Sequence, residues 1–352
     1  MTTQELKLRA GDLVEVKTAA EILATLDEAG CLDGMPFMPE MLSFCGRTMR
    51  VAKVAHKTCD TKCYTGTRSI TACVHLEDSR CDGSGHGGCQ ARCNLFWKEA
   101  WLRSAGTARE SAHTGAPAGR CSEASLARAA WRDEGGVRFY RCQATQILEA
   151  SKLVPWWDPR QYIRDVTSGN ASVSTVAKVL IMSWFNAWRR YGYPYRLSHW
   201  ASRKVHTILF GGPTPNEWAP LAQPLSSASD AVDVQPGERV RIKPHAEIRS
   251  TLKNSRHRGL WFDVEMAGFC QQEFPVALRV EKIINEQTGE MMQMKAPCIM
   301  LEGVVCRGRY SENRLLCPRA IPPYWREIWL ERVADAKQAD VRPPSETAAK
   351  NR

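Results

Sequence analysis

The chain carries the same pattern of residues twice. Four cysteines keep their order and nearly their spacing in both copies: Cys45, Cys73, Cys81 and Cys89 in the first, and Cys270, Cys298, Cys306 and Cys317 in the second. A shift of 225 positions superposes the first three pairs, and three further residues align the fourth. Aromatic positions match as well, because Phe37 falls on Phe262. A match of this length indicates an internal duplication, so the fold must accommodate two homologous units.

Each copy has the pattern of a small, mostly β unit with one helix. Residues 11–17 alternate apolar and polar side chains, which predicts a strand after a turn. Thr18 is a suitable cap for a helix over residues 19–29, which Gly30 ends. Residues 44–54 and 69–76 predict further strands. Short strands of this kind avoid exposed edges by closing into a small barrel.

The predicted fold class is α+β, with two homologous β-rich repeats separated by a helical block. Val176, Leu180 and Trp184 follow helical spacing, so the strongest predicted helix covers residues 173–191. Asp158 followed by Pro159 predicts the start of another helix. The predicted domains are repeat one at 1–103, a linker at 104–136, the central block at 137–219, a second linker at 220–233, repeat two at 234–334 and a mobile tail at 335–352.

Cysteine usage and net charge restrict the cofactors and partners that we expect. The chain has 14 cysteines and a formal net charge of +10. We see no secretion signal and no stretch long and apolar enough to span a bilayer, so we expect a cytoplasmic protein. In a reducing compartment, a cysteine-rich chain favours metal binding over disulfides. The positive charge favours an acidic small molecule or a carrier protein as partner; nucleic acid is less favoured and a membrane is not expected.

The cysteines are candidate metal ligands, because thiolates supply polarizable negative charge to soft or borderline metals. The main candidates are Cys59, Cys81, Cys89, Cys93, Cys270, Cys298, Cys306 and Cys317, and the secondary ones are Cys45, Cys63, Cys73, His56 and His86. Four cysteines suit zinc or an iron–sulfur cluster. We favour the cluster, because the chain lacks the Cys-x2-Cys knuckles usual in structural zinc modules. Repeat one has additional Cys and His residues, so we expect it to hold the working site.

An alternative explanation applies to part of this set. Unpaired cysteine is among the residue types most often buried. Cys45 and Cys73, with their repeats Cys270 and Cys298, lie in strand-like sequence and can be small core residues. The alternative is weaker for cysteines such as Cys81, which lie in polar, Gly-rich sequence.

Known catalytic motifs are missing from the sequence. We find no Walker-type phosphate loop, no dinucleotide fingerprint, no Gly-x-Ser-x-Gly and no His-Glu-x-x-His. A hydrolytic or NAD-dependent enzyme is therefore not indicated. The candidate catalytic residues are Cys142 as a nucleophile, Asp158 or Asp165 as an acid or base, and Arg160 and Arg164 as a clamp for a carboxylate or phosphate.

Two resemblances add to this picture. The motif Gly-Asp/Glu-x-Val-x-Val/Ile-Lys, at 11–17 and 237–243, resembles the first strand of SH3-like barrels such as KOW modules and the β-subunit of nitrile hydratase. Longer motifs are similar to a family of uncharacterised, cysteine-rich bacterial proteins; they lie at 37–41, 44–46, 56–60, 80–83, 156–162, 317–319 and 324–329. The second resemblance implies no activity.

The sequence therefore predicts a metalloprotein that binds an iron–sulfur cluster or zinc through cysteines. If it is an enzyme, redox or cluster-assisted chemistry on a small molecule or a carrier-bound substrate fits best. The alternative is a zinc-stabilised tandem SH3-like module that binds nucleic acid or a protein partner. Colour separates the two hypotheses, because a cluster absorbs visible light and zinc does not.

Overall fold

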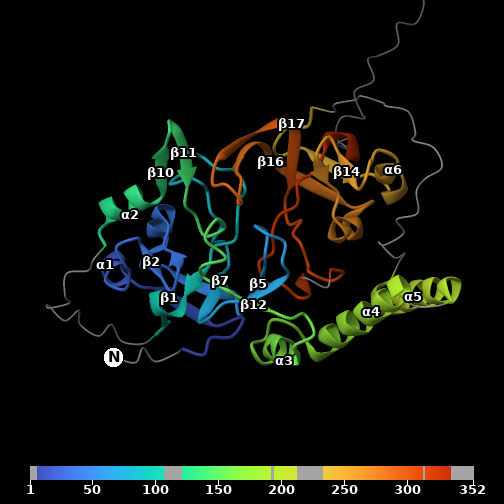
Figure 1. Cartoon of the computed structure of the whole chain (residues 1–352), viewed down its shortest axis with the longest axis horizontal. Helices are drawn as coiled ribbons and strands as arrows, with labels where there is room; N and C mark the ends of the chain where they lie inside the picture. Colours follow the sequence, from blue (N-terminus) through green and yellow to red (C-terminus); the bar gives the residue numbers. More distant parts are fainter. Residues whose placement is uncertain (1–5, 107–120, 192–193, 212–232, 312–313, 334–352) are drawn as a thin grey trace, which may run out of the picture.

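The computed structural model describes residues 6–106, 121–191, 194–211, 233–311 and 314–333. Helices and antiparallel strands occupy largely separate regions, which confirms the predicted α+β class. Figure 1 shows one β-rich region at the left, a second at the upper right, and helices α3, α4 and α5 along the lower right. The predicted tail at 335–352 lies outside the described residues.

Repeat one is built on a five-stranded sheet with the order β8-β7-β4-β1-β9. Its strands are β1 (Leu13–Val16), β4 (Thr48–Val54), β7 (Cys73–Leu76), β8 (Trp97–Lys98) and β9 (Leu102–Ser104). Strand β1 pairs antiparallel with both β4 and β9, so the two ends of the repeat meet. The core packs Phe37 edge-on against Trp97 and Trp101.

Short elements complete repeat one. They are α1 (Ala19–Leu23), the hairpin β2 (Cys31–Leu32) and β3 (Met35–Pro36), and the 3₁₀ helices η1 (Pro39–Phe44) and η2 (Glu99–Trp101). Thr18 and Glu21 form the capping box of α1. The helix ends before the predicted residue 29, because the Thr25 hydroxyl donates to the Ile22 carbonyl and Asp27 accepts the N–H groups of the following turn.

Repeat two has a corresponding four-stranded sheet with the order β17-β16-β13-β18. Its elements are β13 (Arg239–Ile242), α6 (His245–Ser250), β14 (Arg256–His257), β15 (Leu260–Trp261), η3 (Val264–Phe269), β16 (Glu273–Ile284), β17 (Met291–Leu301), η5 (Glu327–Trp329) and β18 (Leu330–Arg332). Strand β13 pairs with β16 and β18 as β1 pairs with β4 and β9. Phe262 packs edge-on against Trp325 and Trp329, as Phe37 does against its two tryptophans.

The chain between the repeats differs in part from the sequence expectation. The predicted linker 104–136 contains α2 (Glu123–Ala129) and β10 (Trp131–Glu134), and β11 (Val137–Tyr140) follows where helix is expected. Strands β10 and β11 form a hairpin because Gly135 and Gly136 both adopt positive φ, which suits a two-residue hairpin turn. A further sheet joins β12 (Lys152–Val154), β6 (Thr67–Ser69) and β5 (Lys57–Cys59).

The central helices follow as α3 (Pro159–Thr167), α4 (Val173–Tyr191) and α5 (Tyr195–Phe210). Asp158 caps α3 by accepting the N–H of Arg160, as expected. Buried Tyr162, Val176 and Val179 form a small core with Leu315 of the chain after β17. The helices are thereby fixed to repeat two as well as to repeat one.

Candidate thiol site at the junction of the repeats

Cysteines from both repeats gather around one buried cation, Arg319. Only 2% of this side chain is exposed. Its guanidinium donates hydrogen bonds to Thr61 Oγ1 at 2.7 Å and to Glu286 Oε1 at 3.3 Å. Its charge acts on the thiols of Cys59, Cys93 and Cys317. A buried charge is costly unless it is compensated, so Arg319 is held by Glu286 and favours negative sulfur around it.

The long β16–β17 hairpin of repeat two brings these groups together. Its end reaches repeat one, where Gln90 N donates to the Lys282 carbonyl at 3.0 Å and Gln287 Nε2 donates to the Lys62 carbonyl at 2.9 Å. The segment after β17 then runs beside β5 and carries Arg319 to Thr61. In Figure 1 the orange hairpin lies against β11, and the red segment lies next to β5.

Cys59 and Cys317 form a thiol pair across the junction. Both side chains are buried, and each thiol changes the pKa of the other. The interaction between the two thiols lowers the pKa of Cys317 by favouring its thiolate, and together with burial it raises the pKa of Cys59. Cys306 acts electrostatically on both sulfurs. We call Cys59, Cys306 and Cys317 the junction thiols.

A second set of thiols comes from repeat one and the chain that follows it. Cys81 donates to Glu40 Oε1 at 3.0 Å, and His86 Nδ1 lies 2.9 Å from the same oxygen. His86 Nε2 faces the Arg141 carbonyl at 3.1 Å. Both ring nitrogens of His86 therefore lie against oxygen atoms. Burial opposes ionisation of Glu40, but the bonds from His86 and Cys81 prevail and lower its pKa.

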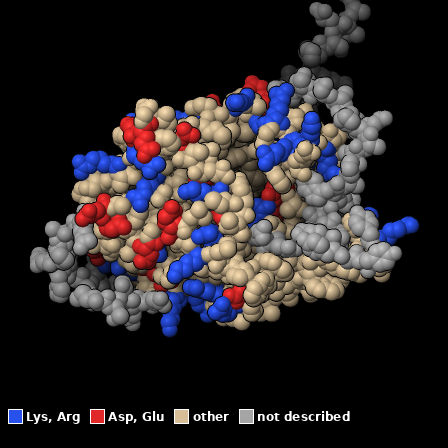
Figure 2. Space-filling view, viewed as in Figure 1, with Lys and Arg blue, Asp and Glu red and all other residues tan. Residues whose placement is uncertain are grey.

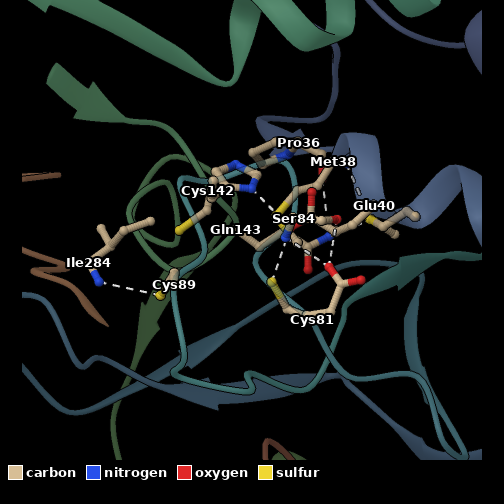
Figure 3. Close-up of polar contacts among 12 residues, drawn as sticks. Pro36, Met38, Glu40, Cys81, Ser84, Cys89, Cys142, Gln143 and Ile284 are labelled. Carbon is tan, nitrogen blue, oxygen red and sulfur yellow. Dashed lines mark hydrogen bonds and ion pairs between the residues drawn. The ribbon is translucent and has the colours of Figure 1, made fainter. Parts of the chain in front are cut away.

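The other members of this set lie near the end of β16. Ile284 N donates to Cys89 Sγ at 3.3 Å. Cys93 and Cys142 lie close enough to Cys89 for its charge to raise their pKa values. Figure 3 shows Cys89 beside Ile284, with Cys142 above it in this view and Cys81 next to Glu40. Burial raises the pKa of Cys93 to about 12 and that of Cys142 to about 11, so both are protonated thiols.

The Gly-rich loop between Cys81 and Cys89 is packed rather than open. Gly83 has a φ of +76°, and a Cβ there would overlap the carbonyl oxygen of Cys89. A Cβ on Gly85 would likewise meet Pro39 and the Glu40 carboxylate. Glycine is therefore required at these positions, where the loop holds the two cysteines near η1.

The remaining candidate cysteines lie away from the junction. Cys73 is in the core of repeat one, with Cys45 packed against it. Cys270 packs on the core of repeat two, and Cys298 lies in a separate small cluster with Met300, where Arg326 Nη1 donates to its sulfur at 3.2 Å. Cys63 is exposed. The four cysteines of repeat two thus do not meet in one place.

As they stand, the described side chains include no group of three or more Cys, His, Asp or Glu arranged to hold a metal ion. The junction thiols are the described cysteines that combine a pair of interacting buried thiols with a third thiol and nearby cations. This combination crosses from one repeat to the other.

The candidate catalytic residues of the central block are divided between surface and interior. Asp158 binds Arg160 Nη2 at 2.8 Å on the exposed side of α3, and Arg164 is in the last turn. Asp165 is fully buried, where Lys57 Nζ lies 2.6 Å and His56 Nε2 3.3 Å from its oxygens. Lys57 has no predicted role, because nothing in the sequence around it distinguishes a buried lysine from one on the surface. The His56 ring also has a second partner, because it contacts the Gln161 carbonyl as well as Asp165.

Comparisons with known proteins give no family. No family model matches the chain, and no curated protein is significantly similar to it. Within the described residues, no helix has both the length and the apolar character needed to cross a membrane. The geometry of the site therefore carries the functional argument by itself.

Proposed function

We propose that the protein binds a metal centre through the junction thiols Cys59, Cys306 and Cys317. The observation that carries the proposal is the interaction of buried Cys59 and Cys317, one thiol from each repeat, with each other and with the buried Arg319. An iron–sulfur cluster is the favoured centre and zinc the other. All described cysteines are free thiols, which supports the accompanying proposal of a reducing, cytoplasmic setting.

The chemistry of the donor set suits such a centre. Metal binding requires thiolates, and the lowered pKa of Cys317 favours that form of its side chain. Three thiolates with a divalent ion carry a net negative charge, which the cations of Arg319 and Lys57 would offset. Binding also requires the side chains to rearrange, because they do not already form a metal-ready group.

The test is anaerobic purification of the full chain with iron and sulfide present. We expect visible absorption and acid-labile sulfide in the wild type, and loss of both in Cys317→Ser. Cys270→Ser is the matched control, because this duplicated cysteine packs on a core away from the junction. A colourless protein with bound zinc that Cys317→Ser releases would assign zinc instead. Metal-free wild type, or equal loss in both variants, would refute the proposal.

If the centre supports an enzyme, its substrate space is the cleft between β11 and β17. This cleft has a volume of about 580 Å³ and is lined by residues that include Arg138, Tyr140, Asn285 and Met291. Asn285 follows Ile284, whose N–H binds Cys89, so the cleft lies close to this thiol of the second set. Arg138 suits a small acidic molecule or the acidic group of a carrier-bound substrate.

The shared strand order of the two sheets supports a second candidate function. We propose that each repeat is an SH3-like barrel, because its first strand pairs with the second long strand and with the last strand, and a 3₁₀ helix precedes that last strand. Zinc-stabilised tandem barrels with a net charge of +10 would bind nucleic acid or a protein partner. Steeply salt-dependent binding to nucleic acid by a colourless protein would favour this function.

A further inference from the structure

The central helices expose an unusual amount of apolar surface. The exposed large apolar residues of this region are Leu153, Trp156, Trp157, Ile163, Val173, Ile181, Trp184, Leu197, Trp200 and Ile208. Single exposed apolar residues are ordinary, but a concentration of them marks an interaction surface. Ile208 is 79% exposed and Val173 68% exposed, so these side chains are not merely at the rim of a core.

Helix α4 has a continuous apolar face with nothing described against it. Val173, Ala177, Ile181, Trp184 and Trp188 are spaced by three or four residues, so they lie on one side of the helix. Trp184 and Trp188 stack with ring centroids 6.0 Å apart, and Trp184 is 62% exposed. We call these five residues the α4 outer face.

The opposite side of α4 is already packed. Val176 and Val179 are buried in the small core with Tyr162 and Leu315, and Met182 and Asn186 continue the same buried side. A helix that is apolar on two sides needs an apolar environment on each of them, and only one side of α4 is packed in the described core. The α4 outer face is therefore available to a partner while α4 stays anchored.

Charge identifies the chemistry of that partner. Residues 173–210 contain six basic residues, Lys178, Arg189, Arg190, Arg196, Arg203 and Lys204, and no Asp or Glu. In Figure 2, the surface that grey atoms leave visible where Figure 1 places α4 and α5 is mostly tan, with blue at its right-hand end and no red. This segment repels a second copy of itself and attracts an anionic surface.

We propose that the α4 outer face binds the surface of an anionic lipid bilayer. Exposed Trp and Ile insert at the boundary between headgroups and acyl chains, while nearby Lys and Arg contact the lipid phosphates. Nucleic acid would also attract these basic residues, but it offers no apolar environment for Val173 or Ile181. The sequence alone predicts no membrane partner because no stretch can span a bilayer, but adsorption requires only one apolar side of one helix.

The test is co-sedimentation of the full chain with vesicles of phosphatidylcholine alone or with anionic phosphatidylglycerol. We expect binding to the anionic vesicles only, with a blue shift of tryptophan fluorescence. Ile181→Ser/Trp184→Ser should weaken this binding by about tenfold or more, because it removes two inserted apolar groups. Trp261→Ser is the matched control, since Trp261 is 53% exposed but lies in repeat two.

Three results would overturn the proposal. One is no binding to anionic vesicles by a folded, monomeric wild type. Another is equal binding by the double variant. The third is a dimer that the double variant dissociates, which would assign the α4 outer face to a second copy of the chain. Circular dichroism of each variant shows whether α4 remains folded.

Discussion

Lys57 and Asp165 provide a direct test of how repeat one is joined to the central helices. Their charged atoms are 2.6 Å apart and both side chains are buried, one on β5 and the other on α3. At an effective dielectric constant of about 20, two unit charges at this distance attract by about 6 kcal/mol. Desolvation costs several kcal/mol for each ion, so the pair is close to neutral relative to an apolar pair of the same size.

Removing one partner is different, because it leaves an uncompensated buried charge. We expect Lys57→Met or Asp165→Leu to lower the free energy of unfolding by about 3–5 kcal/mol each. The double variant Lys57→Met/Asp165→Leu should recover most of that loss. The measurement is urea unfolding at pH 7, followed by circular dichroism and tryptophan fluorescence, with the midpoint and slope compared across the four proteins.

Arg160→Met is the control, because Arg160 and Asp158 form an ion pair of similar length on the exposed side of the same helix. Its loss should hardly move the urea midpoint, since exposed pairs contribute little. Single losses below about 1 kcal/mol, or a double variant whose loss is the sum of the two single losses, would refute the reasoning.

The same pair makes stability depend on pH. Burial raises the pKa of Asp165 to about 6, although the Lys57 charge opposes the shift. In the unfolded chain an aspartate titrates near 4, so between about pH 4 and pH 6 the folded state binds more protons. Asp165 therefore stabilises the fold below this window and loses that contribution as the pH rises through it. Asp165→Asn should flatten the fall, as measured by urea midpoints at pH 4.5 and pH 6.5.

Further variants test the loop and the cores. Gly83→Ala should destabilise the protein well beyond Gly46→Ala in thermal unfolding, because both positions have positive φ but only Gly83 meets a neighbouring backbone. Trp329→Ala should cost about 3–5 kcal/mol in urea, since the side chain is fully buried. Glu265→Ala should cost about 1–3 kcal/mol in the same assay, because its carboxylate accepts the N–H groups of Arg309 and Tyr310; a loss near zero would show that water replaces it.

The duplication in the sequence predicted equivalent environments well at aromatic positions and poorly at cysteines. Phe37 and Phe262 pack against matching tryptophans, because core packing is a local property of each repeat. The matched cysteines instead occupy two kinds of environment: the core of a repeat and the junction between the repeats. Cys73 and Cys298 are core residues, as the alternative explanation expects, whereas Cys317 is at the junction. Spacing alone cannot separate these roles, since both keep a thiol buried.

The junction itself depends on contacts between opposite ends of the chain. No periodicity or motif brings Cys59 to Cys317, because their approach follows from how the β16–β17 hairpin docks on repeat one. One signal was present: the turn residues Asn285 to Gly289 interrupt a long run of strand-forming sequence, which indicates a hairpin longer than its counterpart in repeat one. Its docking surface, however, is a tertiary property.

The two copies of one carboxylate show how a duplicated fold acquires an asymmetric site. Glu40 in η1 accepts a hydrogen bond from the Cys81 thiol and contacts the His86 ring, so in repeat one the loop is held through side chains. Glu265 in η3 ties the equivalent loop through the backbone N–H groups of Arg309 and Tyr310. The loop of repeat two is therefore held without using the Cys306 thiol as a donor. The Cys306 thiol, the counterpart of Cys81, acts instead on Cys317 at the junction. The Cys81 thiol forms its hydrogen bond within its own repeat. The matched glutamates Glu40 and Glu265 thus hold their loops through different groups: a thiol and an imidazole in the first case, and backbone N–H groups in the second.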